Sequence, residues 1–355
     1  MATSLSEVSL GELENRLAAR GFKPAHAAPL LRAHYAGGDL PSTEEGPRRL
    51  PAGLREAVAE DFPDPGAEIV RRQVADDGTV KLLLRLADGR TVESVLMPDF
   101  DPARAAGCVS SQVGCAMGCD FCATTRTGFE RNLTAGEIVA QFIALRREAV
   151  AAGRRLRTLV LMGMGEPMLN LDAVLAATGR IADNRIGGLG WRQITVSTVG
   201  LVPGIDALTA TGLNLHLAVS LHAPDDATRS ALLPPGRRFP IAEILAAADR
   251  FQAARGRTVT IQYCLLRGVN DSPAQAGRLA ELLAGRRMHV NLLTYNPTGM
   301  SLRGVAYEPA REEDAAAFAA ILRERGIVAH FRRSRGPDID AACGQLRRRA
   351  AAAPA

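Results

Sequence analysis

The sequence predicts an α/β protein whose parallel sheet is covered by outer helices. Beyond residue 108, apolar stretches of strand length alternate with stretches of helical periodicity, and this alternation is typical of a parallel sheet. Ahead of it, residues 68–96 alternate between apolar and polar positions and are interrupted by two Asp-Gly turns, which predicts three antiparallel strands. A chain of 355 residues with 47% hydrophobic content can form one large domain with a small appendage.

The elements of the main domain follow one another as strand and helix. We expect its strands at 158–162, 193–197, 216–220, 259–266, 289–294 and 327–331, with a further strand just before the first cysteines. We expect its helices at 135–152, 171–182, 203–211, 241–254, 273–284 and 312–325.

The N-terminal region reads as a small helical module. Apolar residues recur at helical spacing over 8–36, with a break at 21–24, and residues 51–61 read as another short helix. The polar, turn-rich segment 37–46 between them is a linker. The predicted division is a helical RNA-binding-like domain at 1–60, an antiparallel extension at 61–100, the main domain at 101–346, and a basic disordered tail at 347–355.

Composition narrows the class of protein. No run of about 18 apolar residues suggests a membrane span, and residues 1–12 lack the features of a secretion signal, so we expect a cytoplasmic protein. The net charge of +5 and pI of about 9.1 favour a polyanionic partner, although a solvated basic surface explains them too. The predominance of Arg over Lys indicates nothing by itself.

Three clustered thiols predict an iron–sulfur site. Cys115, Cys119 and Cys122 stand at spacings of four and three. Four thiolates complete the ligands of an electron-transfer cluster, whereas three leave one iron of a [4Fe–4S] cluster open to a ligand that is not protein. The alternatives are a zinc site or scattered core cysteines. Zinc in closed sites prefers four protein ligands, and no His or fourth Cys lies at zinc spacing here.

The motif resembles that of radical S-adenosylmethionine (SAM) enzymes, and its flanks resemble the RlmN/Cfr family of adenosine methyltransferases. The matching segments are CVSSQVG at 108–114, GFERNL at 128–133, GMGEP at 163–167, SLHA at 220–223 and DIDAACGQL at 338–346. The resemblance covers the chain from about residue 8 to residue 346. It implies a partial (β/α)6 radical SAM barrel.

The resemblance also implies cofactors and partners. These are a [4Fe–4S] cluster on the three cysteines, two SAM molecules per turnover, and a flavodoxin- or ferredoxin-type electron donor. The implied substrate is 23S ribosomal RNA, with transfer RNA as a second substrate, and the protein is expected to be a monomer without a membrane partner.

Polar residues at strand ends match the SAM contacts of the family. Gly165 and Glu166 follow an apolar strand, and glycines there let a ligand approach the backbone while the carboxylate could accept from an ammonium. A simple strand-end turn is the alternative. Further positions resemble SAM-contacting residues of the family, namely Ser197, Ser220, Leu221, His222 and Asn296. The alternative is that a lone polar residue at a strand end caps the N-terminus of the following helix.

Two isolated cysteines and one glutamate match the catalytic residues of the family. The resemblance implies that SAM methylates Cys343 on sulfur, that a 5′-deoxyadenosyl radical from a second SAM takes hydrogen from this methyl group, and that the resulting radical adds to adenine. Cys108 would then release the product by forming a disulfide with Cys343. Glu93 aligns approximately with the general base of the family, and an exposed strand glutamate is the alternative.

Several basic residues could bind the RNA, and three departures from the family pattern bear on which RNA is preferred. Lys23, His26 and Arg32 could meet phosphates, or could simply be solvated. Arginines beside the Cys343 loop could hold the RNA backbone: Arg332, Arg333 and Arg335. Cys264 is expected to be a small core residue; with Gln262 and Thr294 it departs from the family pattern and leaves the fine substrate preference open.

Three functions compete at this point. The favoured one is methylation of adenosine at C2. The second is methylation at C8 with the same machinery, as in the Cfr type. The third is an RNA-binding or regulatory protein that keeps a SAM cluster without methyl transfer, and the presence of both Cys108 and Cys343 argues against it.

Overall fold

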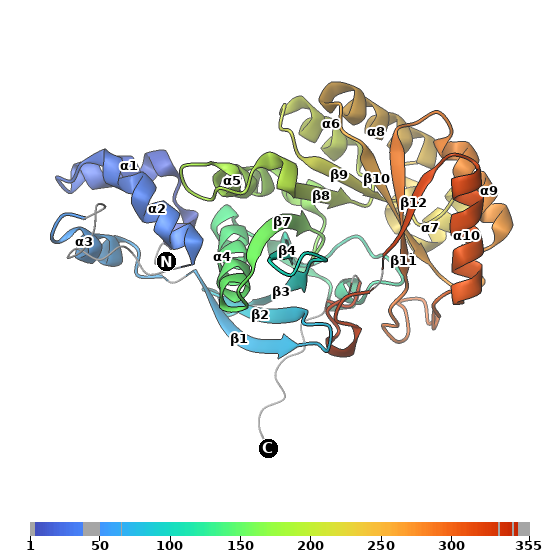
Figure 1. Cartoon of the computed structure of the whole chain (residues 1–355), viewed down its shortest axis with the longest axis horizontal. Helices are drawn as coiled ribbons and strands as arrows, with labels where there is room; N and C mark the ends of the chain where they lie inside the picture. Colours follow the sequence, from blue (N-terminus) through green and yellow to red (C-terminus); the bar gives the residue numbers. More distant parts are fainter. Residues whose placement is uncertain (1–3, 38–49, 65, 333, 343, 347–355) are drawn as a thin grey trace, which may run out of the picture.

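A single ten-stranded sheet organises the molecule (Figure 1). The computed structural model describes residues 4–37, 50–64, 66–332, 334–342 and 344–346. In the sheet, the strand order β1-β2-β3-β4-β7-β8-β9-β10-β11-β12 follows the order of the chain, so each connection joins neighbouring strands.

The parallel part of the sheet confirms the predicted α/β class. Its strands are β4 (Arg104–Cys108), β7 (Arg155–Leu161), β8 (Ile194–Thr198), β9 (His216–Ser220), β10 (Val259–Leu265), β11 (Met288–Thr294) and β12 (Val328–Arg332), each parallel to the next. The helices between them are α4 (Ala135–Ala151), α5 (Leu171–Ala182), α6 (Val202–Ala210), α7 (Asp226–Leu232), α8 (Ile241–Arg255), α9 (Pro273–Leu283) and α10 (Glu312–Glu324).

Local signals explain why the predicted helix bounds are nearly right. Helix α4 begins with a capping box in which Thr134 and Glu137 bond each other's backbone N–H groups, and α9 begins with the same arrangement at Ser272 and Gln275. The sequence analysis missed α7, because seven residues beginning at an Asp225 cap show less than two turns of periodicity.

The antiparallel strands extend the main sheet. Strands β1 (Ala67–Val74), β2 (Val80–Leu86) and β3 (Thr91–Pro98) pair as predicted, and β3 also pairs with β4. One face of β2 and β3 packs in the core that includes α4, through Leu82, Leu84 and Val92. The opposite face contributes Val95 to a second cluster with Cys108, so it belongs to the interior of the main domain.

The N-terminal helices pack at one end of the molecule, far from α9 and α10 in the view of Figure 1. They are α1 (Leu10–Ala19), α2 (Ala27–Ala36) and α3 (Leu54–Asp61), with the short 3-10 helix Leu5–Glu7 in front. Tyr35 is fully buried, and its ring lies 6.5 Å from that of Phe142 on α4, so module and sheet share one core. The division into four segments stays a prediction; most of the linker and the tail at 347–355 lie outside the described residues.

Candidate active site

A cavity opens at the C-terminal ends of strands β7 to β11. This is the edge of a parallel sheet where ligands bind, because loops and backbone groups gather there. The cavity contains about 1030 Å³ of space outside protein atoms, counting its open mouth. Its walls include most of the expected site residues: Cys115, Cys119, Cys122, Gly165, Glu166, Ser197, Ser220 and His222.

The three cysteines are carried by a loop between two short strands, β5 (Gln112–Gly114) and β6 (Phe129–Asn132). The base of the loop is closed by a hydrogen bond from the Cys115 N–H to the Gly128 carbonyl (2.9 Å). Gly114 has φ +78°, and a side chain there would collide with this same carbonyl, so only glycine fits. The sequence analysis missed this hairpin because strands of three and four residues show too little alternation.

The thiols of the loop lie on one wall of the cavity. Burial raises the pKa of the Cys115 thiol to about 12 and that of Cys119 well above its usual value, and the neighbouring thiols add to both effects. Such thiols ionise only when a bound cation compensates the thiolates. Within the described part of the chain, no three His, Cys, Asp or Glu side chains form a group that could hold one metal ion. Three thiols around a shared cavity fit a multi-iron group.

The glycines after β7 also have a packing role. A Cβ on Gly163 would lie 2.7 Å from Ser110 Oγ, and one on Gly165 would lie 2.6 Å from the Cβ of Gln112. The strand segment before the cluster therefore packs directly against one side of these glycines. Gly165, at φ +105°, still lines the cavity on its other side.

Glu166 is a buried carboxylate on the cavity wall. Its side chain accepts hydrogen bonds from the N–H groups of Met168 (3.1 Å) and Val199 (2.8 Å). Burial raises the pKa of Glu166 to about 7, although these N–H groups act in the opposite direction. A carboxylate has about four acceptor positions, so an ammonium ligand can still bind Glu166 and would favour its ionised form.

His222 presents a defined tautomer to the cavity. Its Nδ1 accepts a hydrogen bond from the Cys264 N–H at 2.9 Å. Burial is the main reason why the pKa of His222 falls to about 3, and the Arg229 charge adds to it. The ring is therefore neutral with its proton on Nε2, so it can donate to a ligand. The backbone of His222 has φ +58°, which is uncommon for a residue other than glycine.

Two side-chain amides fasten the base of the cysteine loop to the Glu166 loop. Gln112 donates to Asn132 Oδ1 at 2.7 Å and accepts from the Glu166 N–H at 2.9 Å. Asn170 donates to the carbonyls of Ser111 and Leu133, both at 2.8 Å. The cysteines and Glu166 are thus held at a fixed separation.

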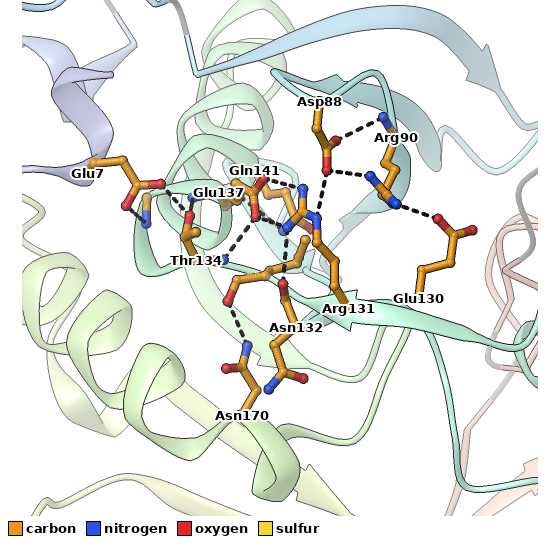
Figure 2. A network of polar contacts seen from close by, with 12 residues as sticks. Glu7, Asp88, Arg90, Glu130, Arg131, Asn132, Thr134, Glu137, Gln141 and Asn170 are labelled. Carbon is orange, nitrogen blue, oxygen red and sulfur yellow. Dashed lines mark hydrogen bonds and ion pairs between the residues drawn. The ribbon is translucent and has the colours of Figure 1, made fainter. Parts of the chain in front are cut away.

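A network of ions holds the same hairpin from outside (Figure 2). Arg131 on β6 binds both oxygens of Glu137 on α4 and one oxygen of Asp88 in the β2–β3 turn, each at 2.7 Å. Glu7, from the N-terminal module, bonds Thr134 and the Gly136 N–H at the start of α4. Three parts of the chain therefore meet at the base of the cysteine loop.

Glu93 and Cys108 lie on the interior side of β3 and β4. Glu93 is only 4% exposed, so it is not an exposed strand glutamate. Cys108 packs with Ala341 in a small buried cluster. Cys343 lies outside the described residues. Its neighbour Gly344 lines the cavity and accepts a hydrogen bond from the Ala123 N–H at 2.7 Å.

Two expected SAM contacts do not line the cavity. The Leu221 side chain is fully buried in the core, and its backbone N–H donates to the Gln262 carbonyl at 3.1 Å. Asn296 is 8% exposed, and its amide approaches the Thr294 carbonyl at 3.4 Å. In contrast, Cys264 is buried as expected but lies on the cavity wall.

Sequence reasoning missed Arg229, which is fully buried behind the cavity. It donates to the carbonyls of Val199 and Ser220, which end or follow strands β8 and β9. Burial lowers the pKa of Arg229 to about 10, and the nearby Cys119 thiol acts against this shift. An arginine two turns after SLHA offers no sequence signal for burial, because arginine is normally exposed.

Comparison with known proteins identifies the family. The model of the radical SAM superfamily matches residues 109–280. A protein of Opitutus terrae, named probable dual-specificity RNA methyltransferase RlmN 1, is 69% identical over 348 residues, which are 98% of this chain and 97% of that protein. This chain belongs to the RlmN family of radical SAM enzymes.

Further comparisons agree with membership of the RlmN family. A protein of Rhodopirellula baltica, also named a probable RlmN, is 45% identical over 96% of this chain and 89% of its own length. A crystal structure of a radical SAM methyltransferase from Sphaerobacter thermophilus matches with a TM-score of 0.89 and 46% identity, over 97% of this chain and 99% of that one.

Membership of the RlmN family makes the chain an RNA methyltransferase and implies a [4Fe–4S] cluster and SAM. The cavity fits this pair, since it joins three thiols to a buried carboxylate and a neutral histidine. Among the described residues, no helix is both long enough and apolar enough to cross a membrane.

The basic residues expected to contact RNA differ in their exposure and in their partners. Arg32 donates to the carbonyls of Arg185 (3.0 Å) and Asn184 (3.1 Å), so it clamps the N-terminal module to the loop after α5. Lys23 and Arg332 are exposed, and His26 is half-buried. The guanidinium of Arg335 lies over the exposed ring of Phe100 at 5.8 Å. Arg333 lies outside the described residues.

Proposed function

We propose that this enzyme methylates C2 of an adenosine in 23S ribosomal RNA, with transfer RNA as a second substrate, and that Cys343 carries the methyl group. The word dual-specificity in the names of its relatives supports two kinds of RNA. An electrophilic methyl transfer to C2 is disfavoured, because this ring carbon is a poor nucleophile, so the carbon has to arrive as a radical.

Different residues of the cavity would bind the cluster and SAM. Cys115, Cys119 and Cys122 would hold the cluster, and Glu166 would accept from the ammonium group of SAM, with His222 donating through Nε2. When bound, the cluster would supply the electron that cleaves SAM into methionine and a 5′-deoxyadenosyl radical. We propose a flavodoxin- or ferredoxin-type protein as the source of this electron.

The two remaining cysteines and Glu93 would handle the carbon and the protons. The Cys343 thiolate takes a methyl group from a first SAM. A radical derived from a second SAM would remove one hydrogen from that methyl group, and the methylene carbon held by Cys343 would then bond to C2. Glu93 removes the C2 proton. Attack of the Cys108 thiolate on the Cys343 sulfur then breaks the sulfur–carbon bond, and the carbon gains a proton as the methylated base leaves.

The proposed reaction steps balance in atoms and in charge. S-methylated Cys343, the Cys108 thiol, the adenosine and SAM become the Cys343–Cys108 disulfide, methyladenosine, methionine and 5′-deoxyadenosine, with the release of one proton. The electron that starts the cleavage is given back when the adduct is oxidised. A thiol reductant has to reopen the disulfide before the next turnover.

The observation that carries the proposal is the meeting of two distant parts of the chain at one cavity. Gly344 lines the same cavity as the three clustered cysteines, and Ala341 packs against Cys108. Residues on both sides of Cys343 therefore support a loop that reaches both the cluster site and the second cysteine.

Mass spectrometry of digested ribosomal and transfer RNA tests the proposal. RNA from cells with the gene should contain 2-methyladenosine that RNA from a deletion strain lacks, and the gene should restore it. A methyl group at C8 would replace our proposal by the Cfr-type reaction. The absence of any change in methyladenosine would reject both reactions and favour the RNA-binding alternative.

A further inference from the structure

Lys81 is an unusual residue in this chain. Of its 43 Lys and Arg residues, only Lys23 and Lys81 are lysines. Lys23 is exposed, whereas Lys81 is 6% exposed on strand β2. Almost all basic residues of this chain are therefore arginines, whereas the buried basic residue on β2 is a lysine. Lysine differs from arginine in having a compact ammonium with three rotatable donors, and arginine does not reproduce it at a small site.

The ammonium of Lys81 bridges two parts of the proposed active site. Its Nζ lies 3.4 Å from Glu93 Oε1 and 3.2 Å from the carbonyl oxygen of Asp340. The side chains of Lys81 and Glu93 are 7% and 5% exposed, so this ion pair is largely screened from solvent. Asp340 stands three residues before Cys343.

The register of the sheet explains why these groups meet. Lys81 pairs with Val95, and Val95 in turn pairs with Cys108. Alternate residues of a strand share a face, so Lys81 and Glu93 lie on the same face as Cys108. The carbonyl of Glu93 also accepts a hydrogen bond from Ser110 Oγ at 2.7 Å, which fixes the strand at this point.

The loop that Lys81 reaches is docked on the β1–β2 hairpin by further bonds. The Asp76 N–H donates to Asp338 at 3.2 Å, and the Gly336 N–H donates to Asp77 at 3.2 Å. These contacts lie at the exposed hairpin turn. Lys81 adds a contact from the buried face, closer in sequence to Cys343.

We propose that Lys81 is a positioning residue that fixes the separation between the base Glu93 and the loop that carries Cys343. Its ammonium holds the Glu93 carboxylate and the Asp340 carbonyl at the same time. Loss of Lys81 removes the ammonium that contacts both groups, and breaking a buried ion pair is costly, so the carboxylate and the loop both shift. This inference rests on the proposed function and concerns the proton-removal step of the same site.

Hydrogen exchange of the full-length protein tests the hold on the loop without any turnover. Lys81→Met should speed exchange in peptides that cover 336–342, and the control Arg85→Met, at an exposed arginine near the end of the same strand, should not. Equal exchange in wild type and Lys81→Met would overturn the proposal. If Lys81→Met does not fold, the double variant Lys81→Met with Glu93→Leu removes both buried charges and takes its place in this comparison.

A double-mutant cycle tests the hold on the base. In Lys81→Met, methylated RNA should fall by about tenfold or more, as expected for impaired general-base catalysis. Deuterium at C2 of the adenosine should then slow product formation more than it does in wild type. In the Glu93→Gln background, Lys81→Met should cause a smaller loss than it causes in wild type, because part of its effect passes through Glu93.

The outcomes of this cycle are distinguishable. Multiplicative losses in the cycle, or an unchanged isotope effect, would show that Lys81 only supports the fold and would overturn the proposal. If wild-type protein forms no S-methylated Cys343, the proposed function has failed, and the hydrogen-exchange comparison alone decides whether Lys81 holds the loop.

Discussion

Gln112 accepts a hydrogen bond from the backbone N–H of Glu166 at 2.9 Å and thereby joins the strand before the cysteine loop to the loop that follows β7. Gln112 is 1% exposed, and its amide also donates to Asn132 on β6. One side chain thus relates the position of the three thiols to that of the carboxylate proposed to bind SAM.

Gln112→Ala should loosen this link. It leaves the buried Glu166 N–H without the acceptor that Gln112 supplies, which costs about 1–3 kcal/mol in the free energy of unfolding. Urea denaturation measures this loss, and anaerobic titration should show weaker SAM binding. Gln73→Ala, at a half-buried glutamine on β1, serves as the control. Unchanged SAM affinity in Gln112→Ala would refute a role in positioning Glu166.

Cys119→Ala should abolish the cluster. Anaerobically reconstituted wild-type protein should contain about four iron and four sulfide per chain, as a [4Fe–4S] cluster requires. The variant should lose the iron, the visible absorbance and all SAM cleavage. Cys264→Ala, which removes the other thiol on the cavity wall, should keep its iron. Tight zinc without iron in wild-type protein would contradict the iron–sulfur assignment.

Cys108→Ala should trap the RNA on the protein. Methylation of Cys343 and radical attack remain possible without Cys108, but no thiol is left to break the sulfur–carbon bond. A covalent protein–RNA species should accumulate and appear as a nuclease-sensitive shift on a denaturing gel. Cys343→Ala should give neither this species nor methylated RNA, while its iron content stays normal. Wild-type yield of free product from Cys108→Ala would mean that another group releases it, and Cys264 would be the next thiol to test.

Arg229→Gln should make the cluster harder to reduce. The guanidinium is fully buried near the Cys119 thiol, and reduction adds negative charge there. Loss of a nearby positive charge lowers the reduction potential, on the order of tens of millivolts for a charge several ångströms away. A redox titration followed by electron paramagnetic resonance measures it. Arg238→Gln, at an arginine stacked on Phe239, is the exposed control; equal potentials in both variants would contradict the prediction.

His34 should make the fold sensitive to mild acid. Burial is the main cause that lowers its pKa to about 4 from 6.5, and the Arg147 charge adds to it. The unfolded chain binds this proton as the pH falls below 6.5 while the folded chain does not, so stability is lost on acidification. The loss is about 1.4 kcal/mol per pH unit at most, or about 2 kcal/mol between pH 6.5 and 5.

Urea denaturation between pH 7 and 5 measures this effect. His34→Gln should show a smaller loss of stability over that range than wild type. His26→Gln, a substitution at a half-buried histidine just before α2, should keep the wild-type slope. Equal slopes in His34→Gln and wild type would show that the buried ring is protonated in the folded state.

The local sequence predicted those features whose cause is local. The spacing of apolar residues predicted the parallel strands β7 to β12 and the six long helices with small errors in their bounds. The reason is that amphipathic spacing and capping residues act over a few positions. The spacing of Cys115, Cys119 and Cys122 indicated the cluster for the same reason, since its ligands come from one loop.

Contacts between distant parts of the chain were decided by the tertiary structure. Nothing near Arg229 in the sequence predicts that it is buried, and nothing near Lys81 predicts that it contacts both Glu93 and Asp340. The sequence also contained no sign that Gln112 packs against Gly165. The physical reason is that burial, the pKa of a side chain and the space beside a glycine depend on which other strand passes there, and only the folded sheet brings these strands together.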